Sequence, residues 1–345
     1  MTGRPTDLKP REAVTRYIDR RSTEITDQSQ STYYYRLKLW ADWCEDRGIE
    51  RVSEYDGWIF EQYEAHRSGL GITTNTLHNE LETLKGHIEY LERIEAVDDG
   101  LADKVHIPEV PEDERSRDTM LAPDRAIELI KFYRSSDEDY ATRFHTLLEL
   151  AWHTGARVGA LRALDLRDFD AGDRLLEFVH RPETDTPLKN KRNGERMVSL
   201  REPVRNVVGS YILHHRADEH DKYGRQPLFA TIKGRPTTGT LRTWMYQATL
   251  PCVRTDCPHG HEPETCNFTQ HTHASKCPSS RAPHHVRTGS LTWHRDRGVP
   301  KEVTGERVNA SQDVIDEYYD KASQRERMEL RRRPHLDKLT IGDNS

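Results

Sequence analysis

Apolar residues recur three and four positions apart along most of the first hundred residues. This spacing places them on one face of a helix. The clearest case is residues 74–94, where the stripe consists of Leu77, Leu81, Leu84, Ile88 and Leu91. The same pattern predicts helices over residues 10–21, 33–48 and 57–68. These stripes are typical of the core of a helical bundle, and Cys44 falls among the core positions.

The pattern changes over residues 105–117, which carry two prolines and many charges without a helical period and are typical of a linker. Helices are predicted again over residues 123–134, 138–153 and 201–218. Two strand-like runs, 175–180 and 196–200, flank the polar stretch PETDTPLKNKRNG, which favours a β-hairpin. The expected fold class is mainly α with a small β-hairpin or sheet (α+β), in two domains, 1–112 and 113–345.

Composition narrows the class of protein. A chain of 345 residues has room for about two domains. We find no apolar run long enough to span a membrane, no secretory signal at the N-terminus and no evenly spread disulfide framework, so we expect a cytoplasmic protein. The chain carries 52 basic and 58 acidic residues, and residues 1–112 hold 14 of the basic and 23 of the acidic ones.

Three segments carry residues suited to phosphate chemistry. In HTGARVGALRAL, Arg157 begins a predicted helix, where a guanidinium and free backbone N–H groups can hold a phosphate. In APHHVR, His284 and Arg287 share a helix face. In DEYYDK, Tyr318 or Tyr319 offers a nucleophilic hydroxyl. Each segment alone is more simply structural; together and in this order they indicate phosphoryl transfer.

The order of these segments resembles that of the tyrosine recombinases, or phage-type integrases, including the Xer-like ones. The resemblance rests on TGARVGALRALDLRDFD, a hairpin lysine, PHHVR and a late tyrosine, and CPSSRAPHHVR and YYDKAS are most similar to archaeal integrases of the haloarchaeal type. It implies a helical, SAM-like core-binding domain followed by a catalytic domain. It also implies site-specific DNA recombination through a 3′-phosphotyrosine intermediate, with no ATP and no metal at the chemical step.

The resemblance also assigns catalytic residues one by one. Those that match the family's pattern are Arg157, Lys191, His284, Arg287 and Tyr319, with Lys189 and Tyr318 as rivals for the lysine and the tyrosine. Ala160 stands where the family has an acidic residue, and Asn309 is the best candidate to replace a histidine or tryptophan before the tyrosine. These two departures leave open an alternative, a weakly active or inactive DNA-binding regulatory relative of the same fold.

An insert rich in cysteine and histidine spans approximately residues 250–280. Its cysteines, spaced C-x4-C-x8-C-x10-C, are Cys252, Cys257, Cys266 and Cys277. Thiols clustered in a reduced chain are typical of a structural zinc site, in which a histidine such as His259 can replace one thiolate. An unmetallated loop and a disulfide pair are the alternatives. The insert precedes His284 directly and could order the loop that presents it.

The resemblance further implies the partners. We expect double-stranded DNA as the substrate, held between the two domains, and a homotetramer on two duplexes close to the nucleoid. In this fold a C-terminal segment commonly packs on a neighbouring protomer. The basic residues 331–345 are the candidate segment here. Deletion of this segment is expected to impair assembly and spare folding.

Overall fold

The structure is a computed structural model and describes residues 5–111, 114, 119–253 and 257–339. The chain divides into two compact units, Met1–Arg117 and Asp118–Ser345. The boundary expected between residues 112 and 113 lies outside the described residues, as does part of the predicted linker. Each unit has its own apolar core and is described by itself below.

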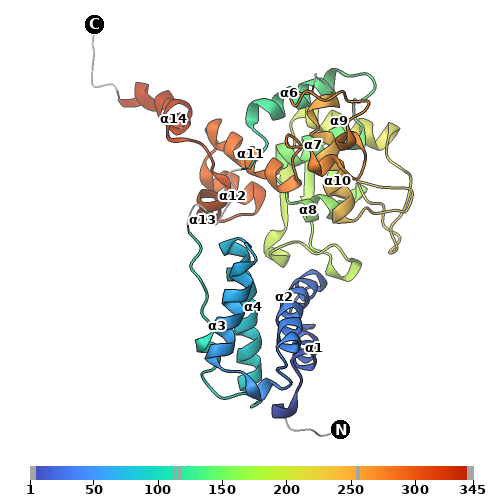
Figure 1. Cartoon of the computed structure of the whole chain (residues 1–345). Helices are drawn as coiled ribbons and strands as arrows, with labels where there is room; N and C mark the ends of the chain where they lie inside the picture. The colour runs from blue at the N-terminus through green and yellow to red at the C-terminus, as the bar shows by residue number, and fades with distance from the viewer. Residues whose placement is uncertain (1–4, 112–113, 115–118, 254–256, 340–345) are drawn as a thin grey trace. The chain divides into compact units, whose positions relative to one another are not determined.

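Four helices pack side by side in the N-terminal unit (Figure 1). They are α1 (Pro10–Arg21), α2 (Asp27–Asp46), α3 (Gly57–Gly69) and α4 (Thr74–Arg93). The apolar stripe predicted for α4 is buried. Between helices α2 and α3 the rings of Trp40 and Tyr63 pack edge to face, with their centroids 4.9 Å apart. Cys44 is fully buried, as predicted.

The prediction for α2 was wrong at its start. The helix begins at Asp27 rather than at residue 33. The reason is the hydroxyl of Thr26, which accepts a hydrogen bond from the backbone N–H of Ser29 and caps the helix a full turn and a half before the apolar stripe becomes regular.

Helix α7 (Arg143–Thr154) forms the centre of the C-terminal unit and is buried along most of its length. Packed against it are α6 (Pro123–Ser135), α9 (Glu202–His214), α10 (Thr238–Ala248) and α11 (Pro283–Asp296). The remaining α-helices of the described residues are α8 (Val158–Ala163), α12 (Lys301–Val308), α13 (Gln312–Val314) and α14 (Gln324–Glu326), and two π-helical turns cover Ile315–Tyr319 and Arg327–Arg332.

Two of these helices are shorter than predicted. Helix α7 begins at Arg143 instead of residue 138, because Thr142 caps it and Ala141 before it has a positive φ of 54°. Helix α9 ends at His214 instead of residue 218. There the N–H of Arg216 turns back to the carbonyl of Tyr211, which closes the helix.

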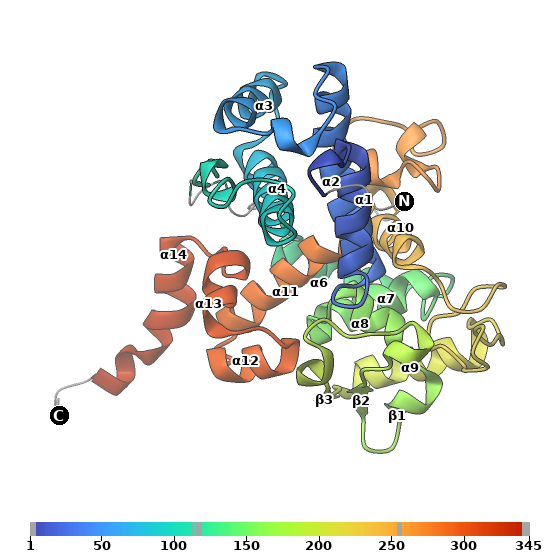
Figure 2. The same ribbon diagram turned by 90° about the horizontal axis from the view of Figure 1, so that it is seen from below.

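A three-stranded antiparallel sheet lies at one edge of the unit, in the order β1-β2-β3 (Figure 2). Its strands are β1 (Phe169–Asp170), β2 (Leu175–Phe178) and β3 (Arg196–Ser199). Pairing of β2 with β3 confirms the predicted hairpin, although both strands are shorter than expected. With so little strand among so many helices, the predicted fold class is confirmed. None of the described helices is long and apolar enough to cross a membrane.

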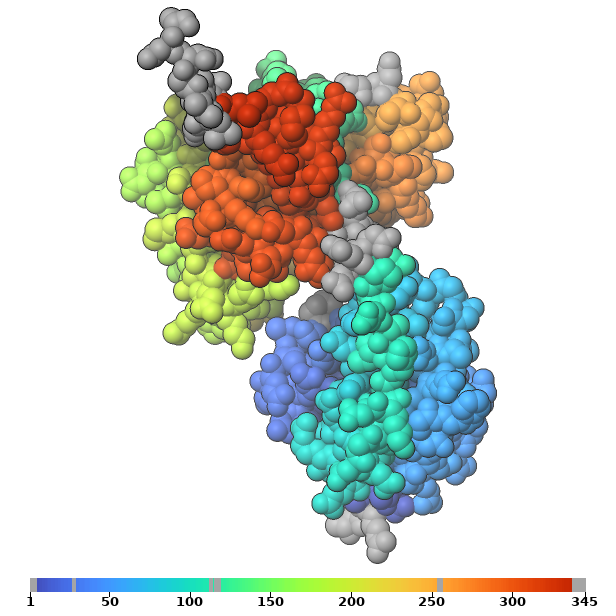
Figure 3. All heavy atoms as spheres, turned by 90° about the vertical axis from the view of Figure 1, so that its left-hand side faces the viewer, coloured from blue at the N-terminus to red at the C-terminus, as the bar shows by residue number. Residues whose placement is uncertain are grey.

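The C-terminal segment, drawn in red in Figure 3, contacts α11 through its π-helical turn Arg327–Arg332. Arg331 connects it to the rest of the unit, since its guanidinium donates to Asp296 at 2.9 Å and to both oxygens of Asp320 at 2.7 and 2.8 Å. Asp320 directly follows Tyr319, so these ion pairs connect the segment to the neighbour of the candidate nucleophile.

Candidate active site

Two of the predicted site residues, His284 and Arg287, lie on helix α11 and contact Tyr319. Pro283 is the first residue of the helix, so His284 and Arg287 lie one turn apart near its start. The Arg287 guanidinium lies 4.8 Å from the centroid of the Tyr319 ring, and the His284 ring lies 5.4 Å from the same ring. Tyr319 is 5% exposed and Tyr318 is 37% exposed. Tyr319 is thus buried against Arg287 and His284, whereas Tyr318 is partly exposed.

The C-terminal end of α12 holds both predicted arginines. Arg157, the N-cap residue of α8, donates from Nη1 to the carbonyl of Asn309 at 2.9 Å. Arg287 donates from Nη1 to the carbonyl of Val308 at 3.0 Å and to that of Gly155. Carbonyls at the end of a helix have no partner within the helix and carry its negative dipole end, so they attract cations. The two arginines therefore share one anchoring point although they are 130 positions apart in sequence.

Asn309 is engaged with the β2–β3 loop. It caps α12 in the left-handed region with φ of 53°. Its Nδ2 donates to the carbonyl of Asn193 at 2.6 Å, and the Nδ2 of Asn190 donates to its Oδ1 at 2.7 Å. The side chain predicted to donate to a phosphate thus joins the loop that carries the candidate lysines to the helix end that carries the arginines.

The two candidate lysines both lie in this exposed loop, Lys189 in a turn and Lys191 in the first position of a short 3₁₀ segment. They differ in their relation to His284. Burial, together with the charges of Arg287, His285, Arg157 and Lys189, lowers the pKa of His284. Lys189 is therefore one of the charges that act on His284, and the choice between Lys189 and Lys191 stays a prediction.

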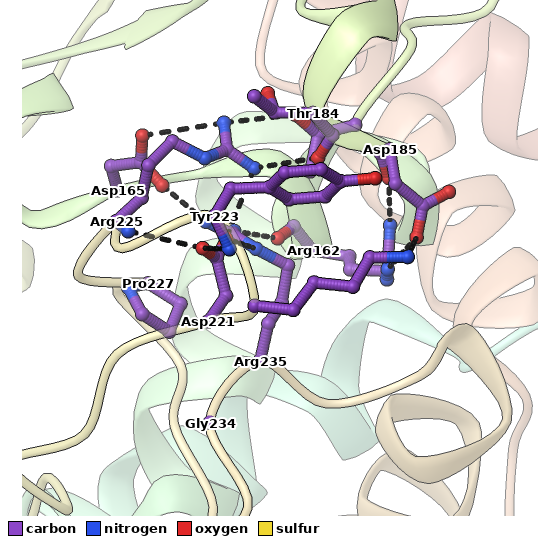
Figure 4. A network of polar contacts seen from close by, with 12 residues as sticks. Arg162, Asp165, Thr184, Asp185, Asp221, Tyr223, Arg225, Pro227, Gly234 and Arg235 are labelled. Carbon is purple, nitrogen blue, oxygen red and sulfur yellow. Dashed lines mark hydrogen bonds and ion pairs between the residues drawn. The ribbon is translucent and has the colours of Figure 1, made fainter.

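An ionic network holds the far side of the loop in place (Figure 4). Arg162 of α8 donates to the backbone and side chain of Asp185, and Arg225 donates to the carbonyl of Thr184 at 2.9 Å. Asp165 is buried among guanidiniums and accepts from Arg235. Because Arg157 is the N-cap residue of α8, this network fixes the lysine loop relative to Arg157.

Arg287 carries unsatisfied hydrogen-bond donors. Only 1% of it is exposed, yet its Nε and Nη2 have no hydrogen-bond partner among the described residues. Burial, with the nearby charge of Arg157, lowers its pKa to about 10. Buried donors without a partner are rare in proteins and destabilising, so a bound anion is the natural partner for these two.

The sequence analysis missed two further arginines at this point. Arg196 of β3 donates from Nε to the carbonyl of Arg307 at 2.8 Å, and Arg307 donates to the carbonyl of His153 at 2.9 Å. Arg196 lies inside the segment KRNGERMVSL that assigned the lysine. An arginine on a strand gives no signal by itself, and only the packing of α12 brings it to the others. Ala160 is buried on α8, where the family has an acidic residue.

The four cysteines of the insert do not form a metal centre in the part of the chain that the structure describes. No group of three or more His, Cys, Asp or Glu residues there is placed to hold a metal. All four thiols are free, and Cys252 and Cys277 pack in one small apolar cluster with Leu250 and Ala274. Burial, together with the other three thiols, raises the pKa of Cys252. The placement of these residues does not support the predicted zinc site.

Two curated proteins are similar to the chain in sequence. One, tyrosine recombinase XerC 2 of Ralstonia nicotianae, is 25% identical over 236 residues, which is 65% of this chain and 64% of that protein. The other, tyrosine recombinase XerD of Staphylococcus epidermidis, is 24% identical over 211 residues, or 61% of this chain and 67% of that protein. The match thus spans about two thirds of the length of these relatives. No protein-family model matches the chain.

Solved structures share the fold over nearly the whole chain. The Tn1549 transposon integrase, in complex with a circular intermediate DNA, aligns over 96% of this chain with a TM-score of 0.67 and 14% identity. A lambda integrase dimer bound to a COC′ core site aligns over 92% with a TM-score of 0.61 and 12% identity. The N-terminal domain of a phage integrase from Haloarcula marismortui is 44% identical over 29% of this chain, with a TM-score of 0.29. An archaeal origin stays a prediction.

Proposed function

We propose that this chain, which has the fold of the tyrosine recombinases and is similar to them in sequence, is a site-specific DNA recombinase. It cuts and rejoins double-stranded DNA through a covalent bond between Tyr319 and a 3′-phosphate. One observation carries the proposal. The guanidinium of Arg287 and the ring of His284 both lie against the ring of Tyr319, and Nε and Nη2 of Arg287 are buried with no hydrogen-bond partner among the described residues.

The chemical step follows from the charges. The hydroxyl oxygen of Tyr319 attacks the phosphorus, the bond from phosphorus to the 5′-oxygen breaks, and the phosphodiester energy is retained in the new phosphotyrosine. Arg157 and Arg287 stabilise the negative charge that grows on the non-bridging oxygens. His284, whose pKa is lowered, is neutral at pH 7 before DNA binds and can accept the tyrosine proton. Reversal of these steps with another 5′-hydroxyl rejoins the strands.

A lysine of the β2–β3 loop completes the step by protonating the departing 5′-oxygen. We propose Lys189 for this role, because its charge acts on His284, and Lys191 is the rival. The test replaces the 5′-bridging oxygen with sulfur, which leaves as a thiolate and needs no proton. Lys189→Ala should be slow on the oxygen substrate and recover on the sulfur one, whereas Lys191→Ala should match the wild type on both. The opposite pattern would assign Lys191.

Covalent trapping tests the function itself. The full-length protein is mixed with fragments of its own genomic surroundings, denatured with detergent and searched for DNA-linked protein, with Tyr319→Phe and Tyr318→Phe in parallel. An adduct that is lost only with Tyr319→Phe supports the proposal and, once the linked DNA is sequenced, gives the target. Absence of an adduct on DNA that the protein binds would refute it and favour a non-catalytic DNA-binding relative.

The active assembly is proposed to be a homotetramer on two DNA duplexes, acting in the cytoplasm near the nucleoid. The C-terminal segment offers a surface for it, since Leu336, which lies within residues 331–345, is an exposed apolar residue on a short helical stretch. Deletion of residues 331–345 should leave single subunits on DNA in analytical ultracentrifugation. Arg331→Ala is the control, because it removes only the ion pairs within the chain. A tetramer of the truncated protein would contradict this role.

A structural zinc ion in the insert is proposed on the chemistry of its residues rather than on their placement. Four free cysteines within 26 residues form a donor set that zinc prefers. The test is the zinc content of the full-length protein purified without chelator, with Cys257→Ser as the comparison. A stoichiometric amount that the variant loses would support the proposal, and its absence from the wild-type protein would overturn it.

A further inference from the structure

Three consecutive carbonyl oxygens at the end of α12 each accept a hydrogen bond from a different arginine. Arg196 donates to the carbonyl of Arg307, Arg287 to that of Val308 and Arg157 to that of Asn309. The three arginines come from β3, α11 and the start of α8. The end of α12 therefore gathers the guanidiniums of Arg157 and Arg287 together with that of Arg196, a residue that the chemical step above does not use.

Arg196 is held so that part of its guanidinium remains available. Its Nε is bonded to the carbonyl of Arg307 at 2.8 Å and its Nη1 to the carbonyl of Gly194 at 2.9 Å. The guanidinium lies 4.2 Å from the centroid of Phe178, its partner across the β2–β3 pair. Among the described residues Nη2 makes no hydrogen bond. A guanidinium that is held at two of its nitrogens and stacked on an aromatic ring loses little further conformational entropy when its third nitrogen binds a ligand.

The charge of this group is not neutralised by the protein. In the part of the chain that the structure describes, no carboxylate lies within ion-pair distance of Arg157, Arg196 or Arg287. The ionic network of Figure 4 shows the contrast, because Arg225 and Arg235 there are paired with buried aspartates. Burial, together with the charges of Arg287, Arg157 and Arg307, lowers the pKa of Arg196 to about 10. Partly buried cations that repel one another call for an anion from outside.

We propose that Arg196 is a third phosphate-binding arginine of the active site, whose Nη2 donates to the phosphodiester held by Arg157 and Arg287. The inference rests on the proposed function, since it concerns the same phosphate. It adds to the site a catalytic residue that comes from β3. The competing role is purely structural, in which Arg196 only fastens β3 to α12.

The experiment measures single-turnover formation of the covalent adduct by the full-length protein, on the DNA found by trapping. Arg196→Ala and Arg196→Lys are compared with Arg192→Ala, which removes an exposed arginine of the adjoining β2–β3 loop. Each variant is used only after its melting temperature matches the wild type. Arg196→Ala should slow the adduct by about 100-fold, the usual cost of losing one donor to a developing oxyanion, and Arg192→Ala should leave the rate unchanged.

A neutral phosphate separates the two roles of Arg196. When the scissile phosphate is replaced by a methylphosphonate, it is uncharged before the reaction and has lost one of its two non-bridging oxygens, so it needs fewer guanidiniums and Arg196→Ala should approach the wild-type rate on that substrate. A structural role would keep the defect equally large on both substrates and would overturn the inference. The slope of log affinity against log salt should also fall by about 1 in Arg196→Ala if one phosphate contact is lost.

The two proposals fail separately. If no variant and no wild-type protein ever forms an adduct, the recombinase function falls. If the wild type forms an adduct that depends on Tyr319, but Arg196→Ala behaves like Arg192→Ala, only the role of Arg196 falls.

Discussion

Gly155, two residues before Arg157, offers a sharp test of the packing of the candidate site. Gly155 ends α7 in the left-handed region, with φ of 59°. A Cβ at this position would lie 2.7 Å from Cγ1 of Val308 and 3.0 Å from Cδ1 of Leu291. The carbonyls of Gly155 and Val308 both accept from Arg287. Gly155→Ala therefore pushes α12 away at the point where it holds the arginines.

The magnitude follows from two separate costs. The left-handed conformation costs a residue with a Cβ about 1–2 kcal/mol. Overpacking against two buried side chains adds about 1–3 kcal/mol. We expect a loss of about 3 kcal/mol in the free energy of unfolding of the C-terminal unit. In a unit of this size, such a loss lowers the melting temperature by about 6–12 °C.

Gly159 provides the matched control. It lies four residues later in α8, has no positive φ, and a Cβ there would have no heavy atom within 4 Å. Gly159→Ala should stabilise the unit by about 0.5–1 kcal/mol through its helix propensity. Calorimetry of the full-length variants measures both effects, and adduct formation well below the transition should be slower only in Gly155→Ala. Equal melting temperatures of the two variants would refute this account of the α7–α12 contact.

Two further predictions concern the N-terminal unit. Arg67→Ala leaves the carboxylate of Glu80, which is 7% exposed, without its partner and should lower the free energy of unfolding in urea by about 3–5 kcal/mol. Arg16→Ala, which breaks an exposed ion pair with Glu12, should lower it by less than about 1 kcal/mol. Similar losses in the two variants would show that burial of the pair is unimportant. His87 is fully buried with neither ring nitrogen bonded among the described residues, and burial lowers its pKa to about 3. In the unfolded chain the imidazole of His87 binds a proton below a pH of about 6.5, but in the folded protein it does so only near pH 3. The free energy of unfolding should therefore fall by up to about 1.4 kcal/mol per pH unit between these two values. His87→Leu should flatten this slope in acid titrations.

The helices that sequence predicts well are those with local start signals. Helices α1 and α6 begin with a proline and were predicted within one residue of their bounds. The start of α2 was missed because a single hydroxyl at Thr26 outweighs the hydrophobic stripe. Strand β1 was missed because two residues carry no periodicity, and its pairing depends on β2.

The residues of the candidate site likewise fall into those that the sequence predicts and those that only the fold brings together. Residues that follow one another in a fixed order, such as His284, Arg287 and Tyr319, can be selected from the sequence because the order itself carries the information. Arg196 cannot, because it stands outside that order and arginine is abundant in this chain. Its position follows only from the fold of α12, whose end lies 111 residues further along the chain. The same is true of Asn309, whose bonds to the lysine loop depend on a tertiary contact.

Two groups of arginines in the C-terminal unit show how the fold separates structure from chemistry. Around Asp165 and Asp221 the guanidiniums are paired with carboxylates, and their contribution is to hold the β2–β3 loop against α8. At the end of α12 the guanidiniums are held by neutral backbone carbonyls, which fix their positions without neutralising their charge. Carbonyl anchoring costs part of the protein's stability, since like charges gather in a partly buried place. Under the proposed function, a phosphodiester that binds here relieves that repulsion, and relieves it further as its charge grows in the transition state, so a chain with a net charge of −6 can still offer a local site for DNA.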